Sequence, residues 1–452
     1  MKWTLSEIAK VVGGELLNQP SEDVIVTHVA TNSQDAKNGT IFVPLVAERN
    51  GHEFVADAVK RGAVASFWSD PVDEAPADLP LIRVKDTEKA LSAFAKGHLE
   101  KVAPKVVGIT GSNGKTTTKD MADAVLSQKF KTHKTPGNEN NQLGVPRTIL
   151  SMPEDTEVLI LEMGMSAPGE ISVLSKLGEP DVAVVTMIGE SHIQAFGSRE
   201  NLALEKMAIL AGLKDDGLFI HPENELLITK NLDLSIRTQT FGADEQAALF
   251  STEVQGDAKK TSFTAEGVNI VLPIPGKYNV NNALIALLIG QEFGLSIAEG
   301  KKGLEQLELT KNRLEWIDGI NGLELLNDAY NASPTSMKAA LEYFADIEIE
   351  GEKVVVLGDI LELGEASKTF HEGIADAIQL DRFKAVYLYG EEMKALYEKF
   401  VDEEKVQHFL GTKDTLTKAI KETTNAGDAV LFKSSNGTDL LSVVDRLKLE
   451  KD

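Results

Sequence analysis

The feature that most constrains the fold is a short glycine-containing segment between an apolar run and a helical pattern. The apolar run VVGIT ends at Thr110, the segment GSNGKTTT follows at 111–118, and a helical pattern continues to Gln128. Glycines let backbone N–H groups point into a concavity, and the N-terminus of a helix adds positive potential. A strand, a glycine loop and a helix in this order predict a phosphate-binding loop in an α/β domain.

This loop predicts a site for a nucleoside triphosphate, and ATP is the co-substrate that we expect. Lys115 is placed to reach the terminal phosphates, and the Thr116 hydroxyl is placed to hold Mg²⁺. The loop departs from the general phosphate-loop pattern, because Ile109 stands where that pattern has glycine and Gly111 is the extra glycine. A motor or switch GTPase and a metabolic kinase or ligase both remain open at this point. The expected nucleotide contacts are Gly111, Ser112, Asn113, Gly114, Lys115, Thr116 and Thr117.

Length and patterning predict three α/β domains. The chain has 452 residues, and roughly 100 to 200 residues per domain is typical. Residues 1–100 mix short β-rich pieces with helical stretches, so we expect a small N-terminal α/β domain. Residues 101–311 carry wholly apolar strands joined by helices, which predict a parallel sheet covered on both faces. A second such alternation over 312–452 predicts a C-terminal Rossmann-like domain.

Composition excludes several classes of partner and chemistry. Acidic residues outnumber basic ones 70 to 46, for a formal net charge of -24. Without a basic tract, we expect no nucleic-acid partner. The chain has no cysteine, which removes thiolate chemistry and disulfides. No apolar run reaches the length of a membrane span and the first residues do not resemble a signal peptide, so we expect a cytoplasmic protein. Separately, we expect a monomer, although the sequence leaves the oligomeric state open.

Polar residues follow the apolar strands at the edge where ligands bind in such sheets. Glu162 ends EVLILE, and His192 lies in the loop after DVAVVTM. Either could be a structural side chain, but together with Thr116 they predict a metal site. Lys206 lies among apolar residues of a helical pattern, where a lysine usually extends to the surface. Asn138, Asn140 and Asn141 cluster in GNENNQLG, and such a loop can form turns or position a polar substrate.

Eight strings in order carry a family resemblance over essentially the whole chain. They are TGSNGKTTT, GNENNQLGVP, LEMGM, IGESHIQAFGS, PGKYNVNNALIA, KNRLEW, NDAYNASPTSM and LGDILELG. In this order they resemble the Mur ligases of bacterial cell-wall synthesis. The strings DAYNASP and LGDILELG, with NGHEF near residue 51, are similar to the members that add D-Ala-D-Ala to UDP-MurNAc-tripeptide.

The resemblance implies roles for particular residues. A lysine at the position of Lys206 is carbamylated in the family and helps to hold a second Mg²⁺, while Glu162 and His192 match metal contacts. Asn279 and Asn282 match positions near the adenine, and Arg313 and Asp328 match an interdomain arginine and a ribose-binding aspartate. Lys115, Lys206, His192 and Arg313 are the expected catalytic residues. The expected substrate contacts are Ser33, Asn138, Asn140, Asn141 and Asn331.

Two departures and several alternatives accompany this resemblance. An Asp-Ser-Arg triplet of the family appears as Asn32-Ser33-Gln34, which removes charged contacts to a diphosphate. A Lys-Gly-Ser-Arg element appears as Lys433-Ser434-Ser435-Asn436, so we assign these four residues no catalytic role. The alternatives are a sister Mur ligase, a ligase similar to folylpolyglutamate synthetase and, from another class, a phosphate-loop switch protein that binds ATP without ligation.

Overall fold

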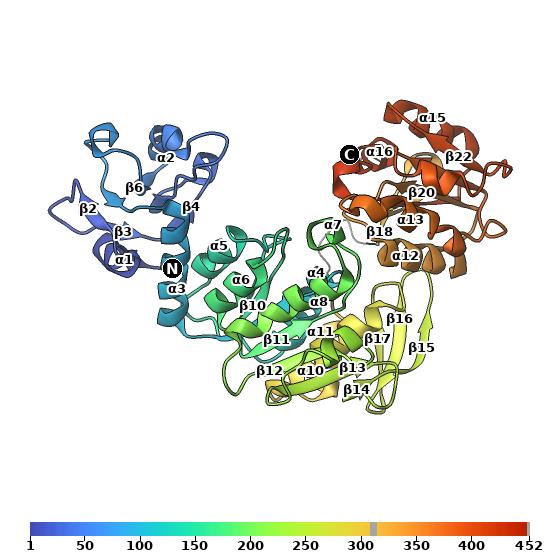
Figure 1. The fold of residues 1–452 in the computed structure, drawn as a ribbon, viewed down its shortest axis with the longest axis horizontal. Coiled ribbons are helices and arrows are strands. Elements are labelled where there is room, and N and C mark those ends of the chain that lie inside the picture. The colour runs from blue at the N-terminus through green and yellow to red at the C-terminus, as the bar shows by residue number, and fades with distance from the viewer. Residues whose placement is uncertain (308–313, 450–452) are drawn as a thin grey trace.

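The computed structural model describes residues 1–307 and 314–449. Its ribbon forms three lobes, with the N-terminal and C-terminal lobes at opposite ends of the central one (Figure 1). This arrangement confirms the predicted three-domain α/β fold. The predicted boundary between 311 and 312 lies outside the described residues. None of the described helices combines the length and the apolar character that crossing a lipid bilayer requires.

The N-terminal domain is built on a five-stranded sheet in the order β2-β7-β6-β5-β4, in which only the β2–β7 pair is antiparallel. Thr4 caps the first helix through a capping box with Glu7. The elements are β1 (Trp3–Thr4), α1 (Leu5–Val12), β2 (Glu15–Leu17), β3 (Ile25–Val26), β4 (His28–Ala30), β5 (Thr40–Phe42), α2 (Val55–Lys60), β6 (Ala63–Trp68), β7 (Leu81–Arg83) and α3 (Thr87–Val102).

The central domain contains a seven-stranded, wholly parallel sheet in the order β14-β13-β12-β11-β8-β10-β9. Its strands are β8 (Lys105–Thr110), β9 (Thr132–Lys134), β10 (Val158–Glu162), β11 (Val182–Val185), β12 (Leu218–Pro222), β13 (Arg237–Gly242) and β14 (Leu249–Phe250). Its helices are α4 (Lys115–Leu126), α5 (Gly144–Ser151), α6 (Glu170–Gly178), α7 (Ile193–Phe196), α8 (Arg199–Met207), α9 (Leu226–Thr229), α10 (Asn279–Glu292) and α11 (Ile297–Leu304).

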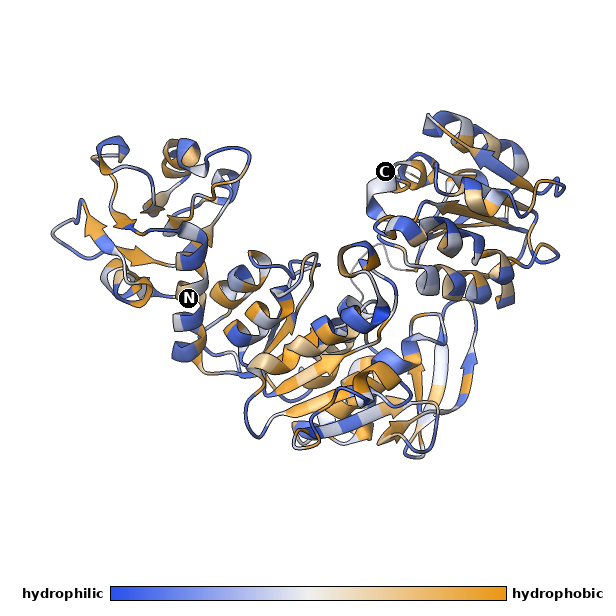
Figure 2. Cartoon of the chain, in the orientation of Figure 1, coloured by the Kyte–Doolittle hydropathy of each residue, from blue (hydrophilic) through white to orange (hydrophobic). Residues whose placement is uncertain are grey.

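Helices cover both faces of this sheet, as its apolar strands predict. Alternate residues of one strand belong to separate cores: Leu159 and Leu161 pack with α5 and α6, whereas Ile160 packs with α4 and α10. In Figure 2 the strands of the central sheet are mostly orange, as their apolar residues require. The central sheet is therefore buried on both faces, and only its strand ends and the loops that follow them reach the cavity at its carboxyl edge.

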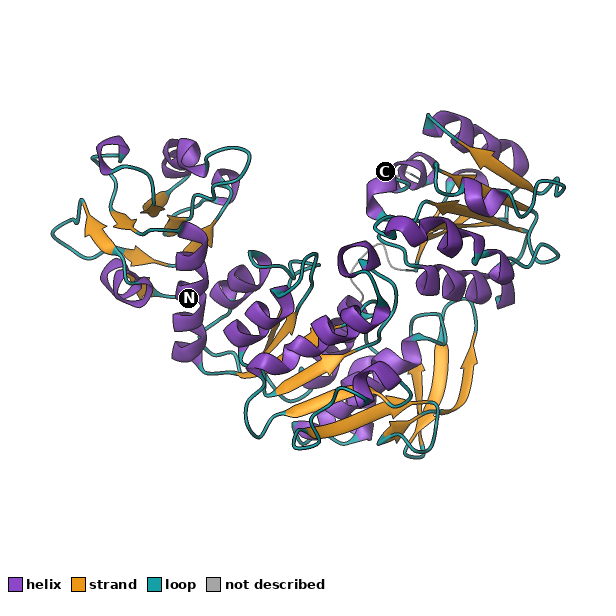
Figure 3. Ribbon diagram, viewed as in Figure 1, coloured by secondary structure: helices purple, strands orange, loops and turns teal. Residues whose placement is uncertain are grey.

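The central domain also has a small antiparallel sheet that the patterning did not predict. It consists of β15 (Thr252–Gly256), β16 (Thr261–Ala265) and β17 (Val268–Leu272), seen beside the main sheet in Figure 3. The turn between β15 and β16 touches the C-terminal domain, because Trp316 Nε1 and Tyr343 OH each donate a 2.8 Å hydrogen bond to the Ala258 carbonyl.

The C-terminal domain is a six-stranded sheet in the order β18-β19-β23-β20-β21-β22, parallel except for β18. Its elements are β18 (Glu315–Asp318), β19 (Glu324–Asp328), α12 (Pro334–Asp346), β20 (Lys353–Gly358), α13 (Ser367–Glu372), β21 (Ala385–Tyr389), α14 (Lys394–Tyr397), β22 (Val406–Phe409), α15 (Lys413–Thr423), β23 (Ala429–Lys433) and α16 (Leu441–Leu447). Short 3-10 turns η1–η8 occupy Ser33–Asp35, Gly51–Phe54, Val72–Glu74, Ala208–Gly212, Ile320–Gly322, Gly364–Ala366, Ala375–Ala377 and Asn436–Thr438.

Candidate active site

The glycine loop follows β8, which lies between β10 and β11 near the middle of the sheet. Two of its glycines have backbone angles that favour glycine, with φ of 146° at Gly111 and 83° at Gly114. A Cβ at Gly111 would collide with the Thr186 hydroxyl, and one at Gly114 would lie 2.6 Å from Asn282 Oδ1. Glycine is therefore required at both positions by conformation and by space.

The loop is fastened to the end of the neighbouring strand β11. Thr186 Oγ1 donates to the Asn113 carbonyl at 2.6 Å, and Ser112 N donates to the Met187 carbonyl at 3.0 Å. Lys115 begins α4, and its Nζ lies 2.8 Å from the Gly111 carbonyl. The lysine thus curls over the loop, which places its positive charge beside the N-terminus of the helix, where phosphate oxygens bind.

A cavity of about 540 Å³ opens beside this loop and extends to the C-terminal domain. Nearly every candidate site residue predicted from the sequence lines this cavity. These lining residues are Gly111, Ser112, Asn113, Gly114, Lys115, Thr116, Thr117, Asn138, Asn140, Asn141, Glu162, His192, Lys206, Asn279, Asn282, Asp328 and Asn331. Residues from six strands or their following loops and helices therefore converge on one site.

Two expected residues are not placed in this cavity. Ser33 lies in the N-terminal domain, where it is buried and its hydroxyl bonds the Asp57 carboxylate, an interaction that lowers the pKa of Asp57. Ser33 does not line the cavity. Arg313 lies outside the described residues.

Glu162 is held rigidly at the end of β10. Its side chain is buried, and Oε1 accepts a 2.7 Å hydrogen bond from Asn140 Nδ2. Its other oxygen, Oε2, is buried with no hydrogen-bond partner among the described residues. Asn141 has a different task, since its Oδ1 accepts hydrogen bonds from the N–H groups of Leu143 and Gly144 where α5 begins.

His192 and Lys206 face the cavity from the segment after β11. His192 has a left-handed backbone with φ of 67°, and its Nδ1 contacts Glu362 of the C-terminal domain. Burial lowers the pKa of His192, Lys115 and Lys206 lower it further, and Glu362 opposes the shift. The Lys206 side chain is buried, and this burial, reinforced by Lys115, lowers the pKa of Lys206 well below its usual value. A neutral amine is thereby favoured at Lys206.

Asn279 and Asn282 join α10 to the phosphate-loop helix. Asn282 Oδ1 accepts from Thr118 Oγ1 at 3.1 Å, and its Nδ2 donates to Asn279 Oδ1 at 3.0 Å. Asn279 Nδ2 in turn donates to the Pro275 carbonyl at 2.7 Å. These bonds fix both amides at the wall of the cavity, and the expected adenine contact stays a prediction.

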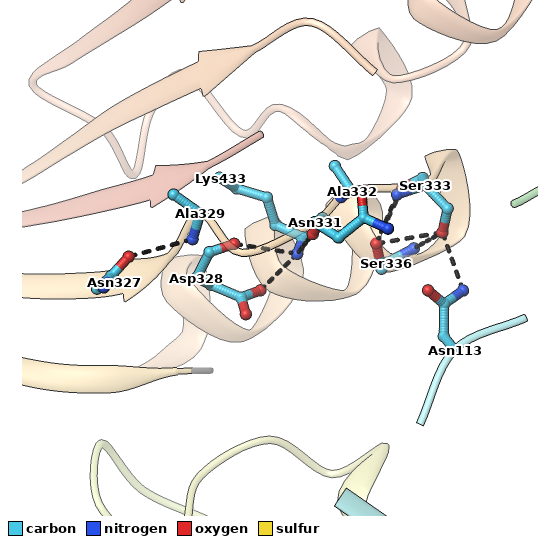
Figure 4. Close-up of polar contacts among 9 residues, drawn as sticks. All are labelled: Asn113, Asn327, Asp328, Ala329, Asn331, Ala332, Ser333, Ser336 and Lys433. Atoms are coloured by element: carbon cyan, nitrogen blue, oxygen red, sulfur yellow. Dashed lines mark hydrogen bonds and ion pairs between the residues drawn. The ribbon is translucent and has the colours of Figure 1, made fainter. Parts of the chain in front are cut away.

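The wall contributed by the C-terminal domain is the turn between β19 and α12, drawn in Figure 4. Lys433 Nζ lies 2.6 Å from Asp328 Oδ2 and donates to the Asn331 carbonyl at 3.0 Å. Ser333 caps α12 by accepting from Ser336 N, and it also accepts a 2.9 Å hydrogen bond from Asn113 Nδ2 of the glycine loop. The phosphate loop and the C-terminal domain are therefore in direct contact.

Lys433 is one of several cavity-lining residues that the sequence did not single out; Tyr278, Asn281, Tyr330 and Thr335 are others. Because the family's Lys-Gly-Ser-Arg element is altered here, we expected no catalytic role for these four residues, yet Lys433 is buried and lines the cavity. A signal was available, because Lys433 ends the apolar run DAVLFK just as Asp328 ends LELLND. The strands that they end, β19 and β23, are parallel neighbours, and Asp328 and Lys433 are paired in register.

The oxygen atoms that line the cavity at the carboxyl edge of the central sheet fit Mg²⁺ better than a softer metal. No group of three His, Cys, Asp or Glu side chains that could hold a metal occurs within 1–307 and 314–449. The cavity offers instead a buried carboxylate oxygen without a hydrogen-bond partner, Glu162 Oε2, and the Thr116 hydroxyl. Mg²⁺ typically takes one or two such protein ligands and completes its shell with water and phosphate oxygens.

Comparisons with known proteins agree with this geometry. Residues 109–290 match the family model of the Mur ligase middle domain, and residues 312–436 match that of the Mur ligase, glutamate ligase domain. A curated relative from Bacillus subtilis, UDP-N-acetylmuramoyl-tripeptide–D-alanyl-D-alanine ligase, is 43% identical over 99% of this chain and 98% of its own.

Solved structures give the same result. The crystal structure of MurF from Acinetobacter baumannii superposes with a TM-score of 0.89 at 29% identity, covering 99% of this chain and 98% of that one. The MurF ligase of Thermotoga maritima in complex with ADP gives 0.80 at 27% identity, covering 93% and 96%. The 43% identity to a curated ligase over nearly the whole chain agrees with the order of the sheets and with the glycine loop. The chain belongs to the Mur ligase family.

Proposed function

We propose that the chain joins D-alanyl-D-alanine to UDP-N-acetylmuramoyl-tripeptide at the expense of ATP, in the synthesis of peptidoglycan precursors. The observation that carries the proposal is the single cavity in which the phosphate loop faces Asp328, Asn331 and Lys433 of the C-terminal domain. The full-length similarity to a ligase of that name supports the choice of substrates. The relative solved with ADP supports ATP as the co-substrate.

The chemistry follows from the weakness of a carboxylate as an electrophile. Transfer of the γ-phosphoryl group to the terminal carboxylate of the tripeptide gives an acyl phosphate and ADP. The amine of D-alanyl-D-alanine then attacks the carbonyl carbon, and phosphate leaves with the former carboxylate oxygen as the amide forms. Lys115 offsets charge on the transferred phosphoryl group, and no protein nucleophile is required, in agreement with a chain that lacks cysteine.

Two Mg²⁺ sites belong to this proposal. Bound Mg²⁺ would offset the negative charge of the transferred phosphoryl group. The residues that would hold the two ions are Thr116, Glu162, His192 and Lys206, all of which line the cavity. A protonated lysine repels Mg²⁺, whereas its CO₂ adduct is an anion, so we infer that Lys206 acts as a carbamate. The buried, low-pKa amine supports this, because only a neutral amine adds CO₂.

Further roles in the proposal come from the family resemblance. Asn279 and Asn282 would lie near the adenine, Asp328 would bind the ribose, and Arg313 would act between the domains. Asn138, Asn140, Asn141 and Asn331 would contact the substrates in the cavity, and Ser33 would contact the UDP-sugar in the N-terminal domain.

Phosphate release tests the reaction. We expect release from Mg²⁺-ATP only when UDP-MurNAc-tripeptide and D-Ala-D-Ala are both present, with a pentapeptide product by mass spectrometry. Release with a single amino acid in place of the dipeptide would indicate a sister ligase. Release without any acceptor would favour a phosphate-loop switch protein and contradict the proposal.

Chemical rescue tests the carbamate. Lys206→Ala should lose activity, and a short carboxylic acid should restore part of it by supplying the missing anion. Lys214→Ala is the matched control, because Lys214 pairs with Asp181 and neither residue lines the cavity. Equal activity of Lys206→Ala and the wild type would contradict the carbamate.

A further inference from the structure

Lys119 is a buried lysine that the proposed chemistry does not use. It lies on α4, one helical turn beyond Lys115, and its side chain is 1% exposed. A lysine is rarely buried to this extent unless its charge and its donors are satisfied. The surroundings of its Nζ atom therefore indicate what it does.

Two of its N–H groups hold the start of the asparagine loop. Lys119 Nζ donates to the Thr135 carbonyl at 2.9 Å and to the Gly137 carbonyl at 2.8 Å. The chain continues directly from Gly137 into Asn138, at the wall of the cavity. Lys119 thus fixes the loop to the same helix that begins at the phosphate site.

The positive charge of Lys119 also lies beside Glu162. Its Nζ is 4.0 Å from Glu162 Oε2, the buried oxygen without a hydrogen-bond partner, and 3.6 Å from Asp120 Oδ1. At this distance in a buried site, the attraction between opposite charges is screened little by water.

Glu162 is consequently held through Lys119 at several points. Its backbone N–H donates to Thr135 Oγ1 at 3.0 Å, and its Oε1 accepts from Asn140 of the loop. Lys119 bonds to Thr135, fixes the start of that loop and faces Oε2. Without Lys119, the Thr135 and Gly137 carbonyls lose a donor at the start of the loop that carries Asn140, and Glu162 Oε2 loses the nearby positive charge.

We propose that Lys119 is a positioning residue that acts through Glu162, setting the orientation of the carboxylate that faces the nucleotide's cation. This inference rests on the proposed function, which makes Glu162 a Mg²⁺ contact. The alternative is that Lys119 only stabilises the fold. A positioning role requires that replacing Lys119 weakens Mg²⁺-dependent nucleotide binding, whereas a purely stabilising role does not.

The test is calorimetric titration of the full chain with ADP, in Mg²⁺ and in EDTA, for the wild type and Lys119→Met. Methionine keeps most of the volume but removes the charge and all three donors. Mg²⁺ should tighten ADP binding at least tenfold less in Lys119→Met than in the wild type. The ADP affinity measured in EDTA should differ by less than twofold between the two proteins. A lower melting temperature with an unchanged Mg²⁺ effect would overturn the proposal.

A double-mutant cycle tests the route through Glu162. The Mg²⁺ effect is the ratio of ADP affinity in Mg²⁺ to ADP affinity in EDTA. When Glu162 is already replaced by Gln, adding Lys119→Met should change this ratio by less than twofold. If Lys119→Met lowers the ratio as much in the Glu162→Gln variant as in the wild type, the proposal is overturned. Lys134→Met is the matched control: Lys134 pairs with Asp120 at 3.0 Å and with Asp123, so it should keep the wild-type Mg²⁺ effect.

Two further points keep the test decisive. If Lys119→Met does not fold, Lys119→Gln, which retains a donor for the loop carbonyls, takes its place with the same expected loss. Phosphate release by the wild type is measured in parallel. If the wild type releases no phosphate but Lys119→Met still reduces the tightening of ADP binding by Mg²⁺, only the proposed reaction is refuted. If the wild type releases phosphate normally but Lys119→Met leaves that tightening unchanged, only the positioning role is refuted.

Discussion

Replacing Lys433 by methionine should destabilise the C-terminal domain strongly. The side chains of Lys433 and Asp328 are 4% and 15% exposed, and their charged atoms lie 2.6 Å apart. Removing one partner of a buried pair costs about 3–5 kcal/mol, because the other charge is left unpaired. Because the Asp328 side chain keeps some contact with water, we expect a loss near the lower end of this range, about 3 kcal/mol. A domain of roughly 140 residues has an unfolding entropy near 0.3 kcal/mol/K, so we expect a fall of about 10 °C in Tm.

The assay is thermal unfolding of the full chain, followed by circular dichroism and compared with Lys413→Met. Lys413 pairs with Asp439 at a similar distance, 2.9 Å, but the Asp439 side chain is 64% exposed. Such a surface pair contributes at most about 1 kcal/mol, so this control should lose no more than about 3 °C. The double variant Lys433→Met/Asp328→Asn should be more stable than Lys433→Met, because no charge remains buried. A Tm for Lys433→Met within 2 °C of the wild type would refute the reasoning.

Three other predictions test separate parts of the structure. Gly111→Ala should abolish ADP binding in calorimetry, whereas Gly267→Ala, also at positive φ but with open space around it, should bind normally; equal affinities would contradict the steric argument. Burial lowers the pKa of His98, so the folded state holds a neutral ring while the unfolded chain titrates near pH 6.5. Its stabilising contribution is complete above pH 6.5 and is lost as pH falls, so between pH 7.5 and 5.5 the urea midpoint should fall more for the wild type than for His98→Gln, and equal falls would exclude this. Asn113→Ala should cost about 1 kcal/mol in unfolding free energy and Ser333→Ala about 2 kcal/mol, because Ser333 also caps α12. The double variant should lose less than the sum of the two, because both changes remove the Asn113–Ser333 hydrogen bond; additive losses would show that the contact is not formed.

Much of the fold could be predicted because its main signals are local. The wholly apolar run at 158–161 required burial on both faces, and the sheet has that burial. The predicted helix from Thr116 to Gln128 corresponds to α4, Lys115–Leu126, since a glycine before it and a loss of apolar periodicity after it mark both ends. The capping box at Thr4 likewise needs only neighbouring residues.

The rest depends on contacts between distant segments. The strand Thr132–Lys134 has no apolar residue, so only its pairing with β10 defines it. The β15–β17 sheet has polar outer positions and a register shift between Thr252 and Gln255, which obscures its alternation. Within the site, strand ends revealed Glu162, but the pairing of Lys433 with Asp328 spans 105 residues and follows only from the strand order.

The two hydrogen bonds to the Ala258 carbonyl have a mechanical consequence. One acceptor atom receives both donors, from Trp316 and Tyr343, so the C-terminal domain meets the β15–β16 turn at nearly a single point. A swing about that point would separate Ser333 from Asn113 while keeping both bonds, whereas sliding the domain sideways would break all three. Such a rotation would also have to break the hydrogen bond from Thr335 to Glu190 and the one from Gln194 N to the Glu362 carbonyl, so these contacts and not the turn oppose the separation of the two domains.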